Sequence, residues 1–309
     1  MSSIPAVTVL VASYNYARYL GSTLRSILAQ TWQDFEVLVV DDGSTDESLA
    51  VARGFAAEDS RVRVITHADG ENHGLSATLA LGLEHAKGQW TAFLESDDLW
   101  LPDNLFRRMQ TAESSGAGVI LNDIFLLPMP GASTAWFEGY VPRVMSWHQR
   151  KGCGSRAYRA DAAFFMENKI PTFSCGMILT ALLREISLVS PVAKWLDWWV
   201  WAQLATRTAF AFVPEKLTQW RLHDKSYHAR VNFWQYLKDY GIMGNGLRSL
   251  ITNTEGQEGQ WAALAFLWLP PGLRLASRLA LPFFNDGLSP TVNGIRSRLG
   301  LAERSDRKP

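Results

Sequence analysis

The stretch "WTAFLESDDLWLPDNL", Trp90–Leu105, joins an apolar run to a dense group of acids. Its first five residues, 90–94, are apolar apart from one threonine and predict a buried β-strand. Glu95, Asp97 and Asp98 follow within four positions, where their carboxylates raise one another's pKa unless a cation neutralises them. Either these acids point apart into solvent, or the end of this strand holds something positive.

Strand and helix patterns alternate through the first 125 residues. Short apolar runs predict strands that are buried on both faces, at residues 7–12, 37–40, 62–65 and 118–123. Apolar residues at helical spacing predict helices between them, at residues 20–28, 75–86 and 105–109. Because strands that alternate with helices form βαβ units, the sequence predicts an α/β fold with a mostly parallel sheet and helices on both faces.

Three polar clusters directly follow predicted strands: "SYN" at 13–15, "DDGS" at 41–44 and "ESDD" at 95–98. Ligands of open α/β sheets bind at the carboxyl ends of the strands, which meet at one edge. We therefore expect the three clusters to form one site. The chain contains neither G-x-x-x-x-G-K-[ST] nor G-x-G-x-x-G, so a glycine loop is not the means of holding a phosphate.

The acids of these clusters each have two interpretations. Asp41 and Asp42 suit a helix N-cap, or carboxylates that accept hydrogen bonds from a nucleobase or ribose. Asp97 and Asp98 suit a solvated turn, or a divalent cation such as Mg²⁺ or Mn²⁺ that completes its shell with phosphate oxygens. We favour the cation, because a metal shared with a diphosphate removes the repulsion between the two carboxylates.

Composition excludes several classes of protein. The formal net charge is zero and 19% of the 309 residues are charged, so no overall field favours nucleic acid as a partner. Two cysteines, Cys153 and Cys175, cannot form a disulfide framework and suit a reducing cytosol. The N-terminus lacks the basic region of a signal peptide, and no apolar run reaches the roughly 18 residues of a membrane span. We expect a cytoplasmic protein.

The periodicity weakens after the fifth predicted strand. Residues 128–170 predict long loops with short helices. Helical spacing returns at 178–188 and 195–205, and residues 210–213 predict a short strand.

A second informative stretch, "WAALAFLWLPPGLRLASRLALPFF", covers residues 261–284. Arg274 and Arg278 lie one helical turn apart among leucines and alanines. A basic amphipathic helix with aromatic flanks can lie in a membrane interface. Packing against the rest of the chain, or in a homodimer, explains the same pattern, and both interpretations stay open here.

Two segments carry a resemblance to a known family: "VTVLVASYNYARYLGSTLRSILAQTWQDFEVLVVDDGSTDES" and "GLSATLALGLEHAKGQWTAFLESDDLWLPDNL". They closely resemble the family 2 glycosyltransferases of the GT-A fold, and the likeness returns more weakly in "PTFSCGMILTALLRE", "KWLDWWVWAQLA" and "WRLHDKSYH". The resemblance implies a Rossmann-like catalytic domain over 1–226, with a nucleotide-binding half at 1–125 and an acceptor-side half at 126–226. Residues 227–309 would form a C-terminal helical, aromatic-rich region.

The resemblance also implies roles for the donor-binding residues. Ser13 and Tyr14 would lie by the nucleobase, and Asp41 or Asp42 would bind it. Asp97 would hold the ribose.

The metal and catalytic roles follow from the same likeness. Asp98 would ligate Mg²⁺ or Mn²⁺ beside the diphosphate, together with His223, and Arg221 would contact the diphosphate of the donor. Asp197 stands in the place of the family's general base, which accepts the proton of the acceptor hydroxyl.

The chain departs from the family pattern at a few positions. Glu95 stands where relatives often have Asp, and Thr78 and Ala80 stand in a helix where many relatives carry Arg or Asn. Leu196 replaces one acid of a pair before the base-bearing helix. These departures leave a catalytically degenerate sugar-nucleotide-binding protein as an alternative.

The implied function is an inverting, metal-dependent transferase that moves a sugar from a nucleotide-sugar to an acceptor hydroxyl. A glycan or lipid-linked acceptor in bacterial surface polysaccharide or glycolipid assembly is expected, at the inner face of the plasma membrane. A nucleotidyltransferase is the rival enzyme, but it would need a glycine-rich basic loop after the first strand. The segment "ASYNYARYL" contains no glycine.

Overall fold

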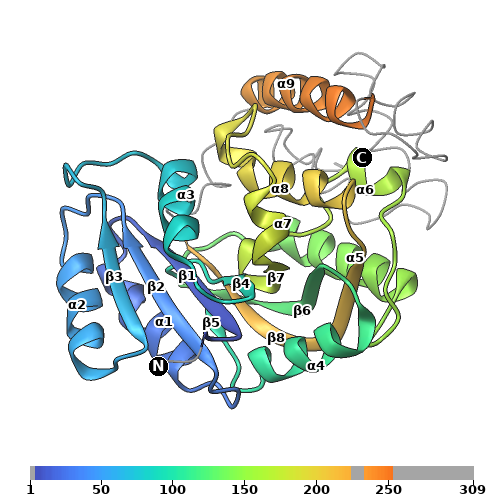
Figure 1. Ribbon diagram of the computed structural model, residues 1–309. Helices are drawn as coiled ribbons and strands as arrows, with labels where there is room; N and C mark the ends of the chain where they lie inside the picture. The colour runs from blue at the N-terminus through green and yellow to red at the C-terminus, as the bar shows by residue number, and fades with distance from the viewer. Residues whose placement is uncertain (1–3, 224–232, 253–309) are drawn as a thin grey trace, which may run out of the picture.

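The computed structural model describes residues 4–223 and 233–252, which form a mixed α/β fold around an eight-stranded sheet (Figure 1). The strand order is β3-β2-β1-β4-β7-β6-β8-β5. The α/β prediction is confirmed, with the predicted parallel strands at one side of the sheet and antiparallel pairings at the other.

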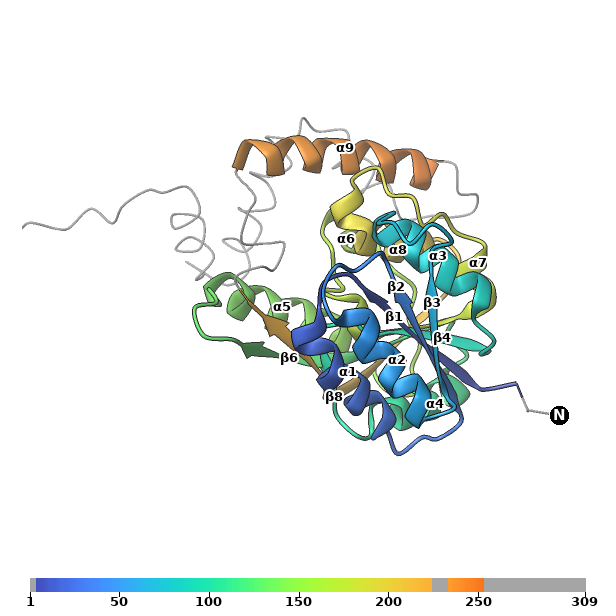
Figure 2. The same ribbon diagram turned by 90° about the vertical axis from the view of Figure 1, so that its left-hand side faces the viewer.

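The N-terminal strands are parallel. They are β1 (Val7–Ser13), β2 (Phe35–Asp41), β3 (Val62–Thr66) and β4 (Trp90–Phe93). The strands β1, β2 and β4 are largely buried, whereas the edge strand β3 is partly buried. Figure 2 shows α1 (Ala17–Leu28) and α2 (Ser48–Glu58) together on one face of these strands. The helix α3 (Leu75–His85) packs on the other face, where its leucines meet those of β1 and β2. The strands predicted from continuous apolar runs are therefore confirmed in this half, because helices cover both faces of the sheet.

The second half of the sheet is built from distant pairings. The strand β7 (Gly176–Leu179) runs antiparallel between β4 and β6 (Val119–Pro128). The strand β8 (Phe210–Leu222) lies parallel to β6 and antiparallel to β5 (Leu99–Trp100).

Two sequence expectations are corrected here. Residues 178–188 were expected to be helical, but β7 ends in this segment and only α7 (Thr180–Arg184) is a helix. A short buried apolar run does not distinguish a strand from a helix, and pairing with two neighbouring strands decided the outcome. The expected strand at 210–213 is the start of the 13-residue β8.

The expectation of long loops over 128–170 is wrong for much of that segment. The helix α5 (Ala135–Lys151) has 17 residues and packs against β6 and β8. Pro142 lies inside this helix, and its buried face is formed in part by Phe137, Tyr140 and His148. Aromatic and histidine side chains at helical spacing obscured the apolar pattern. The short helix α6 (Ala162–Met166) follows.

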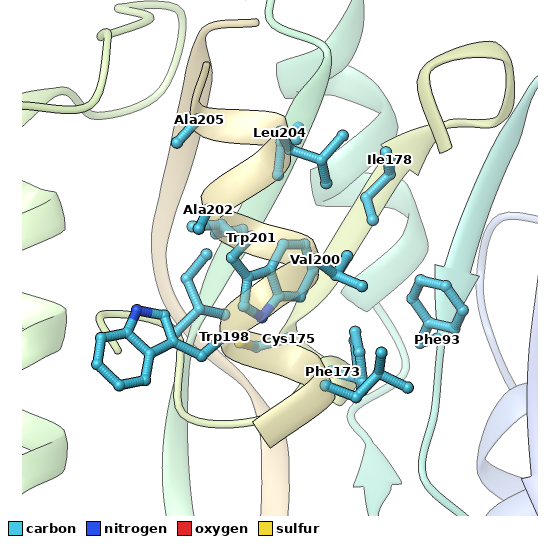
Figure 3. Close-up of a cluster of buried hydrophobic side chains, with 14 of the residues drawn as sticks. Phe93, Phe173, Cys175, Ile178, Trp198, Val200, Trp201, Ala202, Leu204 and Ala205 are labelled. Carbon is cyan, nitrogen blue, oxygen red and sulfur yellow. The ribbon is translucent and has the colours of Figure 1, made fainter. Parts of the chain in front are cut away.

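The helix α8 (Leu196–Ala205) is anchored in the core by Trp201, which is fully buried. Figure 3 shows its indole directed inward near Phe173 of the short helix η1 (Phe173–Cys175), and the two ring centroids are 5.5 Å apart. At Gly176 an added Cβ would lie 2.4 Å from the Trp201 ring, so only glycine fits below it. This packing anchors the middle of α8 against the sheet.

The remaining elements are α4 (Asn104–Ser115), the short helix η2 (Ala193–Trp195) and α9 (Phe233–Thr252). Figures 1 and 2 both show α9 beside α8 at the periphery of the molecule. Part of the predicted C-terminal helical region is thus present, whereas the stretch at 261–284 lies outside the described residues. Among the helices described, none is long and apolar enough to cross a membrane.

Candidate functional site

The predicted polar clusters meet at one edge of the sheet. Ser13, the last residue of β1, pairs with Asp41, the last residue of β2. Leu10 of β1 pairs with Phe93 of β4, so the acids after β4 lie beside the end of β1. Parallel strands thus bring together three clusters that are far apart in the sequence.

Ser13 and Asp41 leave buried polar atoms unsatisfied. Both residues are buried, and neither Ser13 Oγ nor Asp41 Oδ1 has a hydrogen-bond partner within the described part of the chain. The other oxygen, Asp41 Oδ2, accepts from the Ser44 backbone N–H at 3.0 Å. A buried polar atom without a partner costs about 1–3 kcal/mol, so these two atoms indicate a ligand that donates and accepts hydrogen bonds. Tyr14, which follows Ser13 in the chain, is exposed.

Asp42 has a different place from Asp41. Its Oδ1 accepts from the His73 backbone N–H at 2.8 Å, and its Oδ2 accepts from Asn72 Nδ2 at 2.8 Å and the Gly74 N–H at 3.0 Å. The carboxylate therefore holds the loop that leads into α3. Of the two acids expected at a nucleobase, Asp41 is the one with an unpaired oxygen.

Asp98 is also held inside the protein. It is fully buried, its Oδ1 accepts from the Arg221 backbone N–H at 2.9 Å, and its Oδ2 accepts from Ser174 Oγ at 2.6 Å. Burial, and then the charges of Asp97 and Glu95, raise the pKa of Asp98. This carboxyl group therefore links β8 and η1 to the turn after β4 through hydrogen bonds.

The Asp97 side chain contacts a different partner from the Asp98 side chain. Asp97 Oδ2 lies 2.9 Å from His223 Nε2, and the side chain keeps 16% of its surface exposed. The two acids lie in a turn closed by the Asp98 N–H, which donates to the Glu95 carbonyl at 3.0 Å, and their side chains contact different partners. Asp97 was expected at the ribose and Asp98 at the metal. In the structure Asp97 lies beside His223, whereas Asp98 is hydrogen-bonded within the protein.

Two tyrosines that the sequence analysis did not single out complete this region. The rings of Tyr19 and His223 stack with centroids 5.4 Å apart, and the Arg221 guanidinium lies 4.6 Å over the Tyr19 ring. Arg221 is buried, and its Nε and Nη1 have no hydrogen-bond partner among the described residues. Burial, and then Asp97, raise the pKa of Tyr16. Tyrosines three residues apart at the start of the first helix were the available signal.

Asp197 belongs to the same site. It lies in the first turn of α8, and burial raises its pKa to about 6. Burial, and then the charges of Asp97 and, to a lesser extent, Asp197, raise the pKa of Glu95 to about 8. Thr172 Oγ1 donates to Glu95 Oε2 at 2.7 Å. Three partly exposed carboxylates, Glu95, Asp97 and Asp197, thus share one site.

The structure shows what the residues that depart from the family pattern contact. The Thr78 hydroxyl donates to the Gly74 carbonyl at 2.9 Å and lies 3.4 Å from His67 Nε2. Leu196 is buried in the core, so no second carboxylate accompanies Asp197 on α8. Asp197 is therefore the single acid of this helix.

Asp97 and His223 fit the chemistry of a divalent cation. They present an oxygen and a nitrogen 2.9 Å apart, both of which can bind Mn²⁺. Within residues 4–223 and 233–252, no group of three His, Cys, Asp or Glu residues could hold a metal alone. Phosphate oxygens of a substrate could complete the shell of a cation here, as is usual for Mg²⁺.

Comparison with known sequences places the chain among the transferases. The model of glycosyl transferase family 2 matches residues 8–180. The putative glycosyltransferase EpsH of Bacillus subtilis is 40% identical over 118 residues, which cover 38% of this chain and 33% of EpsH. The succinoglycan biosynthesis protein ExoO of Rhizobium meliloti is 36% identical over 138 residues, or 45% of this chain and 38% of ExoO. The match spans about a third of the length of these curated relatives.

Solved structures share the fold. S. aureus TarS 1–349 in complex with UDP-GlcNAc has a TM-score of 0.64 at 17% identity, covering 95% of this chain and 80% of TarS 1–349. The mannosyltransferase PcManGT from Pyrobaculum calidifontis, in complex with GDP-Man and Mn²⁺, has a TM-score of 0.61 at 18% identity. That match covers 97% of this chain and 81% of PcManGT. At these identities the similarity shows a common fold.

Proposed function

The chain belongs to glycosyl transferase family 2 and has the GT-A fold, and on that premise we propose that it is an inverting glycosyltransferase. It would move a sugar from a nucleotide-sugar donor to an acceptor hydroxyl. The observation that carries the proposal is Asp197, a carboxylate with a pKa raised to about 6 that shares a site with Glu95 and Asp97 at the carboxyl edge of the sheet.

The donor nucleotide would bind at the ends of β1 and β2. Asp41 Oδ1 and Ser13 Oγ, both buried and unpaired in the described structure, would bond the polar edge of the base. The exposed Tyr14 ring would cover it. TarS in complex with UDP-GlcNAc and PcManGT in complex with GDP-Man support a nucleotide-sugar as the ligand of this fold.

The diphosphate would lie between Asp97 and Arg221. The unpaired Nε and Nη1 of Arg221 are suited to phosphate oxygens. Asp97 and His223 would hold Mg²⁺ or Mn²⁺, which when bound neutralises the charge that develops on the departing diphosphate. PcManGT in complex with Mn²⁺ supports a metal in this fold.

Asp197 would act as the general base. A carboxylate with a pKa near the working pH is ionised in part and accepts a proton efficiently. As Asp197 takes the proton of the acceptor hydroxyl, the acceptor oxygen bonds to the anomeric carbon on one face. The bond between that carbon and the diphosphate oxygen breaks on the opposite face, and the configuration inverts.

The acceptor would be a glycan or a lipid-linked sugar in bacterial surface polysaccharide assembly. The relatives ExoO, of succinoglycan biosynthesis, and TuaG, of putative teichuronic acid biosynthesis in Bacillus subtilis, support this class. A cytoplasmic position at the inner face of the plasma membrane is part of the proposal and rests on the sequence pattern at 261–284 alone.

The test is Asp197→Asn, which keeps the size of the side chain but cannot take the proton. We expect kcat to fall about 10²–10⁴-fold, while a nucleotide-sugar chosen by thermal shift from UDP-, dTDP-, GDP- and CMP-sugars binds with unchanged affinity by calorimetry. Asp161→Asn is the matched control, since Asp161 accepts from a backbone N–H at the start of α6.

Turnover by Asp197→Asn within a few-fold of wild type would exclude Asp197 as the base and leave it as a helix-terminal acid. Donor binding without any turnover in the wild-type protein would support the degenerate sugar-nucleotide-binding alternative. Release of pyrophosphate rather than of a nucleoside diphosphate would support a nucleotidyltransferase.

A further inference from the structure

Asn168 contacts the carboxylate of Asp197 from the segment that precedes β7. Asn168 Nδ2 donates to Asp197 Oδ2 at 2.8 Å. Asn168 Oδ1 accepts from the Ile170 backbone N–H at 3.1 Å, and because that N–H can only donate, the amide oxygen must face it. The amide group is thereby oriented, and its NH₂ is directed at Asp197.

The backbone around Asn168 is held from α5. Three consecutive residues are each bonded by this helix: Glu167, Asn168 and Lys169. The Tyr140 hydroxyl donates to the Asn168 carbonyl at 2.7 Å, and Arg143 bonds both carboxylate oxygens of Glu167 at 2.6 and 2.5 Å. His148 Nε2 donates to the Lys169 carbonyl at 2.9 Å. The donor to Asp197 is therefore set in place before any substrate binds.

From this geometry we infer that Asn168 is a positioning residue, whose amide holds the Asp197 carboxylate in the rotamer and the ionised form that proton transfer requires. The inference rests on the proposed function of Asp197. A hydrogen bond to the charged form of a carboxylate favours that form, and it opposes the effect of burial on Asp197.

Other charges near Asp197 do not replace the amide. Glu95 is an acid whose pKa is raised to about 8, by burial first and in part by the charge of Asp197, so it offers no positive partner to the Asp197 carboxylate. Lys194, three residues before Asp197, is paired with Asp239 of α9. Glu167 is paired with Arg143 and Lys169. Asn168 and the backbone at the start of α8 are the groups that favour the carboxylate.

The test is the pH dependence of kcat in two variants, Asn168→Ala and Asn168→Asp. Aspartate has the same size as asparagine, so an effect of Asn168→Asp cannot come from lost packing. In Asn168→Ala the acidic limb of the profile should move upward by about one pH unit, which lowers kcat at neutral pH about twofold through the smaller ionised fraction of Asp197. In Asn168→Asp a second carboxyl replaces the amide, so the limb should move further. Donor affinity should stay at the wild-type value in both, because the donor edge lies at β1 and β2.

Tyr140→Phe is the matched control. It removes a hydrogen bond to the main chain of the same residue but keeps the amide, with Arg143 and His148 still holding the segment. It should lower the melting temperature and leave the pH profile of kcat unchanged.

A folded Asn168→Ala or Asn168→Asp protein with a wild-type pH profile and kcat would overturn the inference. So would an equal shift of the profile in Tyr140→Phe, which would mean that loosening of the segment is the cause. Asp197→Asn separates this failure from that of the proposed function. If Asp197→Asn is inactive and the Asn168 variants are normal, only the positioning role is wrong.

Discussion

Buried polar atoms differ between the proposed donor side, at the ends of β1, β2 and β8, and the segment around Asn168 on the proposed acceptor side. On the donor side, Ser13 Oγ, Asp41 Oδ1 and two nitrogens of Arg221 are buried without a partner in the described residues. On the acceptor side, Asn168 uses both polar ends of its amide, and both ring nitrogens of His148 are bonded. The proposed donor side thus presents buried polar atoms to a ligand, whereas the segment around Asn168 bonds its own. On α8 itself the indole N–H groups of Trp198, Trp199 and Trp201 also lack a partner in the described residues.

This difference has a consequence for stability. Buried polar groups without a partner reduce the stability of the free protein, and a ligand that bonds them stabilises it. Groups that bond one another stabilise the free fold and fix the direction of a reactive side chain. Substitutions on the two sides should therefore separate into changes of binding and changes of folding.

Trp201→Ala should have the largest effect and should appear in folding alone. The indole is fully buried between α8 and η1, so its removal leaves a large cavity on the acceptor side. We expect the free energy of unfolding to fall by about 3–5 kcal/mol, measured by urea denaturation. A loss below about 1 kcal/mol would show that α8 is not anchored by this contact.

Asp98→Ala should change folding, whereas Asp97→Ala should change binding, although the two acids are adjacent. Asp98→Ala leaves the Arg221 N–H and the Ser174 hydroxyl without acceptors, so unfolding should become easier by about 2 kcal/mol or more. Asp97→Ala should change stability by less than about 0.5 kcal/mol but remove the effect of Mn²⁺ on donor binding, measured by calorimetry. The reverse pattern would restore the roles expected from sequence.

His148→Gln tests the acceptor side through pH. Burial lowers the pKa of His148 to about 4, below its unfolded value of about 6.5, so the unfolded chain takes up the proton first as the pH falls. The histidine therefore stabilises the fold fully above about pH 6.5 and less down to about pH 4. The stability advantage of wild type over His148→Gln should shrink by about 2 kcal/mol between about pH 7.5 and about pH 5. A constant advantage would mean that His148 is not kept neutral by burial.

Asp41→Ala should have the smallest effect on folding and a clear effect on binding. The substitution removes an unpaired buried oxygen together with the bond to the Ser44 N–H, and the two changes offset each other to within about 1 kcal/mol. Donor affinity should fall about tenfold, since a hydrogen bond to a charged group is lost. Asp42→Ala is the contrast: three donors lose their acceptor, so stability should fall by about 1–3 kcal/mol. Equal donor affinity in Asp41→Ala and wild type would remove Asp41 from the nucleotide site.

The sequence alone determined the architecture of the first half and the position of the donor edge. Parallel strands that are covered on both faces are continuous apolar runs, and the polar residues at their ends share one edge, so local patterns were sufficient. The acids at 41–42 and 95–98 were placed correctly for the same reason. Asp197 on α8 came from the resemblance to the family, and the helix itself from its spacing.

The tertiary structure decided what each residue of the site contacts. Periodicity could not place β7 between β4 and β6, because its partners lie more than fifty residues away along the chain. Nor could it show that Asp98 bonds the Arg221 backbone while Asp97 faces His223. Two adjacent aspartates are identical in sequence, and only the fold decides which partner each side chain contacts. The segment that carries Asn168 is bonded by α5, a helix with an internal proline and no leucine that packs against β6 and β8.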